Sequence, residues 1–199
     1  MKTYLVIAAA LAGWSAQASA QDFTGPSIGV QAGWNSTDVQ LPGGSNGVPG
    51  IDRSTDAFVA GGFLAYDHEV MPRVVIGAQA EFNIAASNDF SAVGDTATVR
   101  VDPRYAFDLT ARVGYPVTPE TLIYVRGGYS NARVRTSIEA DSKLTTMSDN
   151  RDGWIVGGGA ERMITDHVSA RLEYRYADLG EGQDKFDRHQ VLVGAAYRF

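Results

Sequence analysis

The sequence predicts a membrane-spanning β-barrel of eight antiparallel strands. Apolar and polar residues alternate with period two in segments of about ten residues, the length with which tilted strands cross an outer membrane. The links between the segments are alternately short and long, and aromatic residues stand at the ends of the apolar faces. A soluble β-sandwich also alternates, so the link lengths and the aromatic positions make the distinction.

The first 20 residues are expected to be a cleaved secretory signal peptide. Lys2 precedes the short apolar run Tyr4–Gly13, and Ala18, Ser19 and Ala20 form a small-x-small cleavage signal before Gln21. The apolar run is about half of the ~20 residues that a spanning helix needs, which disfavours a membrane anchor. We therefore expect a signal peptide over residues 1–20 and one barrel domain over residues 21–199.

Composition excludes several other classes. Removal of Lys2 leaves 16 Lys+Arg against 23 Asp+Glu, so the mature chain carries a net charge of −7, which argues against nucleic-acid binding. The chain has no cysteine, so it has neither disulfides nor a lipid-attachment cysteine.

Eight segments are expected to form the strands. In order, they are Ser27–Asn35, Asp56–Asp67, Arg73–Ile84, Arg104–Tyr115, Leu122–Val134, Gly153–Met163, Val168–Asp178 and Asp187–Phe199. The second separates Val59 and Phe63 from Phe58, Leu64 and Tyr66. The third separates Val74, Ile76, Ala78, Ala80 and Phe82 from Gln79, Glu81 and Asn83.

The later segments follow the same rule. The fourth places Tyr105, Phe107, Leu109, Ala111, Val113 and Tyr115 opposite Ala106, Asp108, Thr110, Arg112 and Gly114. The fifth is less regular, with Tyr124 beside Arg126 on the presumed inner face. The sixth is rich in glycine, and the seventh places Val168, Ala170, Leu172, Tyr174 and Tyr176 opposite Ser169, Arg171, Glu173 and Arg175. The eighth alternates to the last residue through Val191, Val193, Ala195, Tyr197 and Phe199.

The links indicate the orientation of the barrel. Tight links are expected at His68–Pro72, Pro116–Thr121 and Ile164–His167, and long polar loops at Ser36–Thr55, Ala85–Pro103, Arg135–Asp152 and Ala177–Arg188. Short turns on the periplasmic side and long loops outside are typical of membrane barrels. The expected interfacial aromatic girdles consist of Trp34, Tyr66, Tyr105, Tyr115, Trp154, Tyr176 and Tyr197.

Charged residues on the second face are expected to fill the lumen. They are Glu81, Asp108, Arg112, Arg126, Glu161, Arg171, Glu173 and Arg175. Each arginine would cost ~2–4 kcal/mol on the lipid face at mid-depth, so these residues should point inward and pair. We expect Glu161 to lie opposite Arg171, and Asp108 to lie diagonal to Arg126. The balanced signs favour a plug over a selective pore.

No constellation predicts catalysis, a metal site or a cofactor. His167 and Ser169 have the spacing of a His/Ser pair, which resembles a feature of lipid A deacylases, but the neighbouring sequence does not match. The acidic residues of the last two loops lack calcium-loop spacing. These residues are Asp149, Asp152, Glu181, Asp184 and Asp187. The sequence therefore indicates a protein that is not an enzyme.

The chain also resembles a family. His189–Phe199 (HQVLVGAAYRF) resembles the closing strand of small Gram-negative outer-membrane β-barrels, and Leu172–Gly180 and Gly153–Glu161 resemble strands of opacity-type and outer membrane protein A-like barrels. The resemblance implies an outer-membrane location and an assembly signal at Val193, Tyr197 and Phe199. It also implies that the barrel assembly machinery and periplasmic chaperones handle the chain. No peptidoglycan-binding domain follows Phe199, so the wall-tethering role of two-domain members is not expected.

The leading hypothesis is a monomeric envelope-structural protein or surface antigen with a plugged lumen, surrounded by outer-membrane lipid and lipopolysaccharide. A small porin-like diffusion channel and an adhesin that binds a host through its outer loops remain open alternatives.

Overall fold

The computed structural model describes residues 23–41, 51–85, 90–93, 97–140, 143–180 and 185–199. Nine strands occupy most of these ranges: β1 (Gly25–Leu41), β2 (Ile51–Met71), β3 (Val74–Ala85), β4 (Phe90–Val93), β5 (Ala97–Thr118), β6 (Thr121–Ala140), β7 (Lys143–Met163), β8 (Val168–Asp178) and β9 (Lys185–Arg198). Within the same ranges, no helix is long and apolar enough to cross a membrane.

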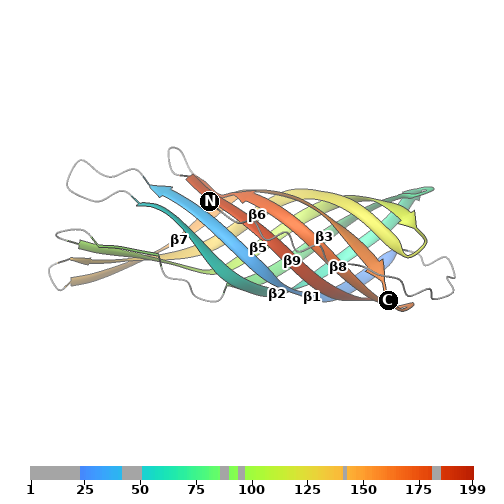
Figure 1. Ribbon diagram of the computed structural model, residues 1–199, viewed down its shortest axis with the longest axis horizontal. Coiled ribbons are helices and arrows are strands. Elements are labelled where there is room, and N and C mark those ends of the chain that lie inside the picture. The colour runs from blue at the N-terminus through green and yellow to red at the C-terminus, as the bar shows by residue number, and fades with distance from the viewer. Residues whose placement is uncertain (1–22, 42–50, 86–89, 94–96, 141–142, 181–184) are drawn as a thin grey trace, which may run out of the picture.

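Eight of the strands close into an antiparallel barrel, as the sequence predicted (Figure 1). Their order around the barrel is β1-β2-β3-β5-β6-β7-β8-β9. The first and last strands complete the circle with a ladder that runs from Ser27 opposite Arg198 to Gln40 opposite Lys185. The short strand β4 lies outside this circle and pairs with β5.

The two ends of the barrel differ. Three tight turns and the C-terminus lie together at the right of Figure 1, here named the turn end, and the long strand extensions lie at the left, here named the hairpin end. The turns are at Pro72–Arg73, Pro119–Glu120 and Ile164–His167. Arg73 adopts a left-handed backbone with φ of 66°, which a tight turn demands and which L-residues seldom accept.

The strands are longer than predicted, so the expected loop bounds were wrong. The span Arg135–Asp152, expected to be a loop, lies mostly in β6 and β7, whose ladder continues to Ala140 opposite Lys143. Likewise, β1 and β2 remain paired to Leu41 opposite Ile51, inside the expected first loop. Beyond the apolar region a strand can be hydrated on both faces, so no period-two apolar pattern marks these extensions.

The expected tight links were also too long at two places. β2 runs through His68 to Met71, and β5 runs to Thr118, which leaves two-residue turns after each strand. Hydrogen bonds in the ladder continue through both segments, although β-bulges interrupt the register near Glu69 and Pro116. The link Ile164–His167 has the predicted bounds.

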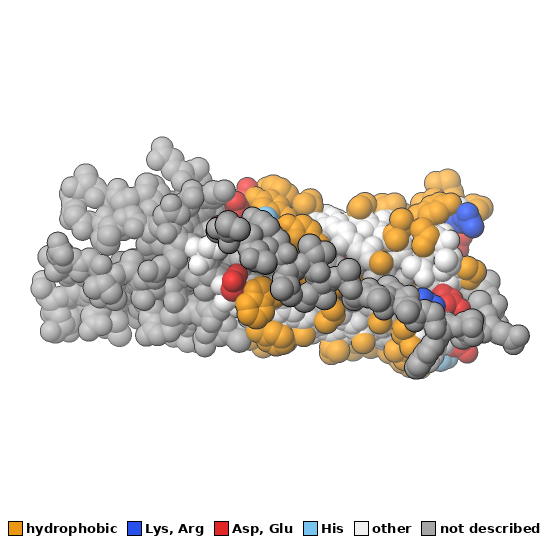
Figure 2. Space-filling model, viewed as in Figure 1, with side chains coloured by type: hydrophobic (Ala, Val, Ile, Leu, Met, Phe, Trp, Pro, Cys, Tyr) orange, Lys and Arg blue, Asp and Glu red, His pale blue; other side chains and the backbone are white. Residues whose placement is uncertain are grey.

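The barrel carries apolar side chains on its outer surface and polar side chains in its interior, the reverse of a water-soluble protein. In β8 the outward residue Leu172 is 42% exposed and Tyr174 is 52% exposed, while the intervening Glu173 is 1% exposed. On the face shown in Figure 2, apolar side chains gather toward both ends of the described barrel wall, with backbone and other side chains visible between them. Large apolar side chains exposed in this number are compatible with an apolar surrounding medium, and the polar core must satisfy its own hydrogen bonds.

Candidate functional site: the charged lumen

Buried charged side chains fill the lumen in two large groups and one pair. The turn-end group is Asp67, Arg112, Glu161 and Arg198. The central group is Glu81, Arg126, Arg171, Glu173 and Arg175. The hairpin-end pair is Asp108 and Arg188. All eleven side chains are at most 6% exposed and come from strands all around the barrel.

In the turn-end group, two arginines share two carboxylates. Arg112 donates to both oxygens of Asp67, from Nε at 2.7 Å and from Nη2 at 2.6 Å, and from Nη1 to Glu161 at 2.8 Å. Arg198 reaches the same two carboxylates at 3.2 and 3.1 Å. Gly77 lies between Asp67 and Arg112, and a Cβ there would come within 2.0 Å of the Asp67 carboxylate. A glycine at this position therefore allows the bidentate pair to form.

In the central group, Arg126 and Arg175 each bridge Glu81 and Glu173. Arg126 donates to Glu81 and, at 3.0 Å, to Glu173. Arg175 donates to Glu173 and, at 2.6 Å, to Glu81. The hydroxyl of Tyr124 donates a further bond of 2.5 Å to Glu173. Each carboxylate is thus held by several donors, which is what buried ions require.

Arg171 differs from the other central arginines because it donates to amide oxygens. Its Nη1 donates to Gln79 at 2.9 Å and its Nη2 to Gln31 at 2.5 Å. The guanidinium lies over the ring of Phe63, 3.6 Å from the ring centroid. The cation–π contact and the hydrogen bonds to neutral groups compensate for the desolvation of this buried cation.

The hairpin-end pair is more loosely bonded. Arg188 Nη2 donates to Asp108 at 3.4 Å and to the hydroxyl of Ser130 at 3.0 Å. Ser130 donates to the same carboxylate, and Asn83 donates to its other oxygen at 3.3 Å.

Apolar side chains border the charged region at both ends. At the turn end, Phe23, Val75, Leu122, Tyr124 and Met163 form a buried cluster. Arg198 ties Phe23 to this cluster by donating to its carbonyl at 2.7 Å. At the hairpin end, the buried apolar side chains include Ile155, Ala177, Leu179 and Phe186. The turn-end group of charges therefore lies beside a region of low polarity.

The structure places all eight charged residues named from the sequence inside the barrel, but the two expected pairs are not the ones formed. Glu161 does lie opposite Arg171 in the β7–β8 register, yet its carboxylate bonds to Arg112 and Arg198. Asp108 lies opposite Ser130, four residues from Arg126, so the expected diagonal pair was wrong. Long side chains reach across the narrow lumen, so cross-strand adjacency does not select their partners.

Sequence reasoning missed Asp67, Arg188 and Arg198. Period two could have found Arg198, because it alternates with the outward residues Tyr197 and Phe199 at the end of β9. Asp67 lies on the same inward face as Phe63 and could have been found in the same way.

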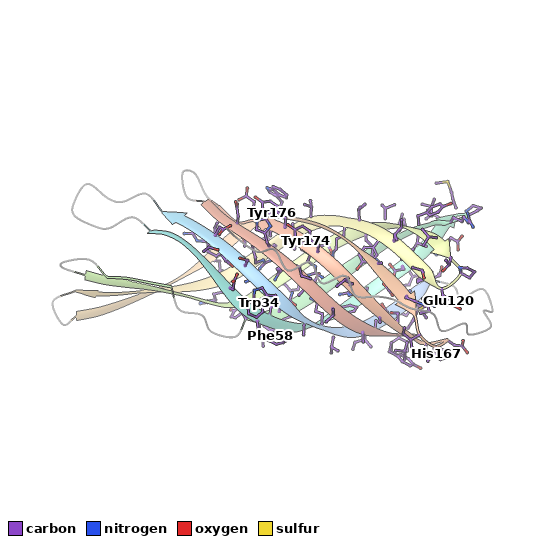
Figure 3. The ribbon with its side chains drawn as sticks, in the orientation of Figure 1. Trp34, Phe58, Glu120, His167, Tyr174 and Tyr176 are labelled. Atoms are coloured by element: carbon purple, nitrogen blue, oxygen red, sulfur yellow. The ribbon has the colours of Figure 1, made fainter. Side chains whose placement is uncertain are left out.

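The expected girdle residues fall at two levels on the outer surface. Trp34, Tyr105, Trp154 and Tyr176 belong to the hairpin end, and Tyr66, Tyr115 and Tyr197 to the turn end. Tyr176 is partly buried between Trp154 and His189, with ring centroids 5.4 and 5.0 Å away. Figure 3 shows Trp34, Phe58, Tyr174 and Tyr176 toward one end of the wall and Glu120 and His167 at the other.

The structure describes the expected C-terminal assembly signal but not the expected signal-peptide cleavage site. Val193, Tyr197 and Phe199 lie exposed on the outer surface, with the rings of Tyr197 and Phe199 in edge contact at 5.1 Å. Ala18, Ala20 and Gln21, the expected cleavage residues, lie outside the described residues.

His167 and Ser169 do not form a pair. His167 is exposed in the turn and stacks on Tyr197, whereas Ser169 is buried in the lumen and donates to Glu161 at 2.8 Å. His167 precedes the first residue of β8, so strand alternation does not align the two side chains.

Asp152, one of the acidic residues that lack calcium-loop spacing, is exposed and has two donors beside it. The hydroxyl of Tyr129 and the amide of Asn131 each donate to it at 2.5 Å. These bonds lower the pKa of the Asp152 carboxyl below its usual value. Within the described part of the chain, no group of three or more His, Cys, Asp or Glu residues is placed to hold a metal ion.

Known proteins share both the sequence pattern and the fold. A family model described as the outer membrane protein beta-barrel domain matches residues 6–199. The 31 kDa outer-membrane immunogenic protein of Brucella melitensis is 28% identical over 201 residues, which cover 89% of this chain and 84% of that protein.

A 22 kDa outer membrane protein of Rhizobium leguminosarum is 27% identical, with 75% of this chain and 70% of that protein covered. The crystal structure of Ail, the attachment invasion locus protein of Yersinia pestis, superposes with a TM-score of 0.52 at 13% identity, covering 88% of this chain and 100% of Ail. Neisserial surface protein A gives 0.51 at 14% identity, over 86% of this chain and 97% of that protein. The chain therefore belongs to the outer membrane protein beta-barrel domain family and is an outer-membrane protein.

Proposed function

We propose that this protein is a non-enzymatic barrel whose lumen is plugged by its Arg–carboxylate groups, with a structural and surface-antigen role in the envelope. The observation that carries the proposal is the central group, in which Arg126 and Arg175 each join Glu81 to Glu173 across the lumen. An eight-stranded barrel has an interior that side chains can fill. An ion that crossed this lumen would have to separate several buried ion pairs.

The signs of the lumen charges support a plug. The two groups and the pair contain five carboxylates and six guanidinium groups, so neither sign dominates. Selective pores are usually lined by one sign. The buried apolar cluster at the turn end further disfavours a continuous aqueous path.

The strand extensions support a role at the cell surface. From Trp154, at the hairpin-end girdle, the β6–β7 ladder continues to Lys143, which is about 35 Å along the strand at ~3.3 Å per residue. Barrels of this class place their longer connections outside the cell. The Brucella relatives are named immunogenic proteins, which fits exposure of this region.

Planar-bilayer recording on the refolded mature chain tests the plug. We expect no stable discrete conductance from wild type. Arg162→Gln, which removes an ion pair at the turn-end rim, serves as a control and should be equally silent. Discrete wild-type conductance that changes in Arg126→Ala but not in Arg162→Gln would establish the diffusion channel instead.

A deletion strain tests the envelope role separately. We expect increased detergent sensitivity and membrane blebbing, because a rigid barrel contributes to the mechanics of its membrane. Unchanged sensitivity, blebbing and stiffness would argue against that role without bearing on conductance.

Adhesion is the second candidate, favoured by the hairpin extensions and by the fold shared with a protein named for attachment and invasion. Transfer of the four hairpin-end connections onto a neutral barrel should transfer binding to host cells if they carry it. Retention of host-cell binding after their replacement in the parent would exclude them as the binding surface.

The same proposal covers the oligomeric state of the protein, its lipid environment and the factors that assemble it. We infer a monomer embedded among outer-membrane lipid and lipopolysaccharide, delivered by periplasmic chaperones and inserted by the barrel assembly machinery through its terminal strand. Exposed Val193, Tyr197 and Phe199 on β9 support the last point, because an assembly factor could read them from outside the barrel.

A further inference from the structure

A small cavity of about 40 Å³ lies inside the lumen near the hairpin end. Its lining includes the polar residues Asn35, Thr37, Asn83, Arg188 and Gln190, the aromatic residue Tyr105, and the apolar residues Val59 and Phe186. Phe186 lies two residues before Arg188 in β9 and is therefore nearer the hairpin end of that strand.

Four of the polar residues form one block on the inner wall. Asn35 lies opposite Gln190 in the β1–β9 ladder, and Thr37 lies opposite Arg188. All four side chains point inward and are at most 7% exposed. This block is therefore part of the seam that closes the barrel.

Three buried atoms of this block have no hydrogen-bond partner within the described protein: Asn35 Oδ1, Gln190 Oε1 and Arg188 Nε. The Nε atoms of Arg126 and Arg198 are also unpartnered, but neither residue lines this cavity. An unmade hydrogen bond at a buried polar group costs about 1–3 kcal/mol. The three residues that carry these atoms all line this one cavity, so a molecule bound in the cavity could supply the missing partners.

The donor set identifies that occupant. One N–H donor and two carbonyl acceptors match a water molecule, which accepts once and donates twice. An anion would face two acceptor oxygens, and a cation would face a guanidinium group. A water needs about 10–15 Å³ of such space, so the cavity has room for up to about three.

We propose that this cavity is a hydrated chamber that binds a cluster of one to three ordered water molecules on Asn35, Arg188 and Gln190. The chamber marks the limit of ordered water in the lumen, because the amides of the central group are bonded within the protein. Gln31 bonds to Glu81 and Asn83 and accepts from Arg171 and Arg175. This inference goes beyond the plugged lumen and does not depend on whether the barrel conducts.

Water–amide cross-relaxation in NMR spectra of the refolded wild-type protein tests the proposal. We expect long-lived water cross-peaks at the side-chain amides of Asn35 and Gln190. The matched controls are the side-chain amides of Gln31 and Gln79, which are equally buried in the same lumen but bonded to protein partners. These controls should show no such cross-peaks.

Three results would overturn the chamber. Absence of the cross-peaks at both Asn35 and Gln190 would show a dry cavity. Equal cross-peaks at Gln31 and Gln79 would show water throughout the lumen. A shift of the Arg188 Nε–H and Gln190 resonances when chloride is replaced by bromide would identify a halide ion instead.

A variant provides an independent readout. Gln190→Leu removes one acceptor and fills part of the space, so the cross-peak at Asn35 should weaken at least twofold while the Gln31 amide stays unchanged. Persistence of the full Asn35 signal would show that its water does not depend on the chamber. If the variant does not fold, the wild-type comparison with Gln31 and Gln79 still decides.

Discussion

The central group and the chamber lie in the same lumen, yet they satisfy buried polarity in opposite ways. Around Glu81 and Glu173, guanidinium groups, amides and a tyrosine hydroxyl form hydrogen bonds within the protein, and few polar atoms lack a protein partner. Asn35, Arg188 and Gln190 line a cavity, and each carries a buried polar atom that has no partner among the described residues. The difference shows that hydrogen bonds in a polar lumen can be satisfied in two ways. In one segment ion pairs within the protein satisfy them, and in the neighbouring segment water molecules do.

Arg126→Met should have the largest effect, because it breaks the sealed segment. It leaves Glu81 and Glu173 with fewer donors inside the barrel, and removal of one partner of a buried ion pair costs about 3–5 kcal/mol. Urea unfolding in lipid vesicles, followed by tryptophan fluorescence, measures this loss. Addition of Glu173→Gln should recover part of it, and full additivity of the two losses would contradict the pairing.

Gln31→Leu should be the next most costly change. Gln31 donates to Glu81 and Asn83 and accepts from Arg171, so leucine leaves several buried groups without a partner. We expect a loss of about 2–3 kcal/mol in the same unfolding assay. A loss below about 1 kcal/mol would mean that water enters the central group and replaces the amide.

Gln190→Leu is the matched substitution in the chamber, and it should lower the unfolding free energy by less than about 1 kcal/mol. Its Oε1 has no protein partner, so the exchange displaces water and adds apolar contact with few protein hydrogen bonds lost. Comparison of the two glutamine variants under identical conditions sharpens the contrast between the segments. If both variants lost the same unfolding free energy, the two segments would not differ in how their polar groups are satisfied.

Glu120→Gln should have the smallest effect and sets the scale for an ion pair outside the lumen. Glu120 accepts from Arg162 at 3.3 Å in the turn-end rim, where both side chains contact solvent. Such pairs contribute about 0–1 kcal/mol, and less at high salt. An unfolding free energy that falls by more than about 1 kcal/mol would show that the rim pair is coupled to the lumen groups.

Period two in the sequence determined the fold, the number of strands in the barrel wall and the face on which each residue of the regular segments lies, but it did not predict the short strand β4. Arg112, Arg171 and Arg175 could be assigned inward because a lipid-facing arginine is too costly, and the alternation of β8 held along its whole length. The ends of the strands could not be predicted, because the extensions such as Lys143–Asp152 leave the apolar region and lose the constraint that creates the pattern.

Only the tertiary structure decided the partners inside the lumen. Asp67 and Arg112 meet across Gly77, and Arg126 reaches Glu81 and Glu173 rather than Asp108. Register fixes the Cα positions, but a guanidinium at the end of a long side chain can reach several strands in a narrow barrel. The sequence therefore determines which side chains enter the lumen, and the arrangement of all the strands around the closed barrel decides which of them bond to one another.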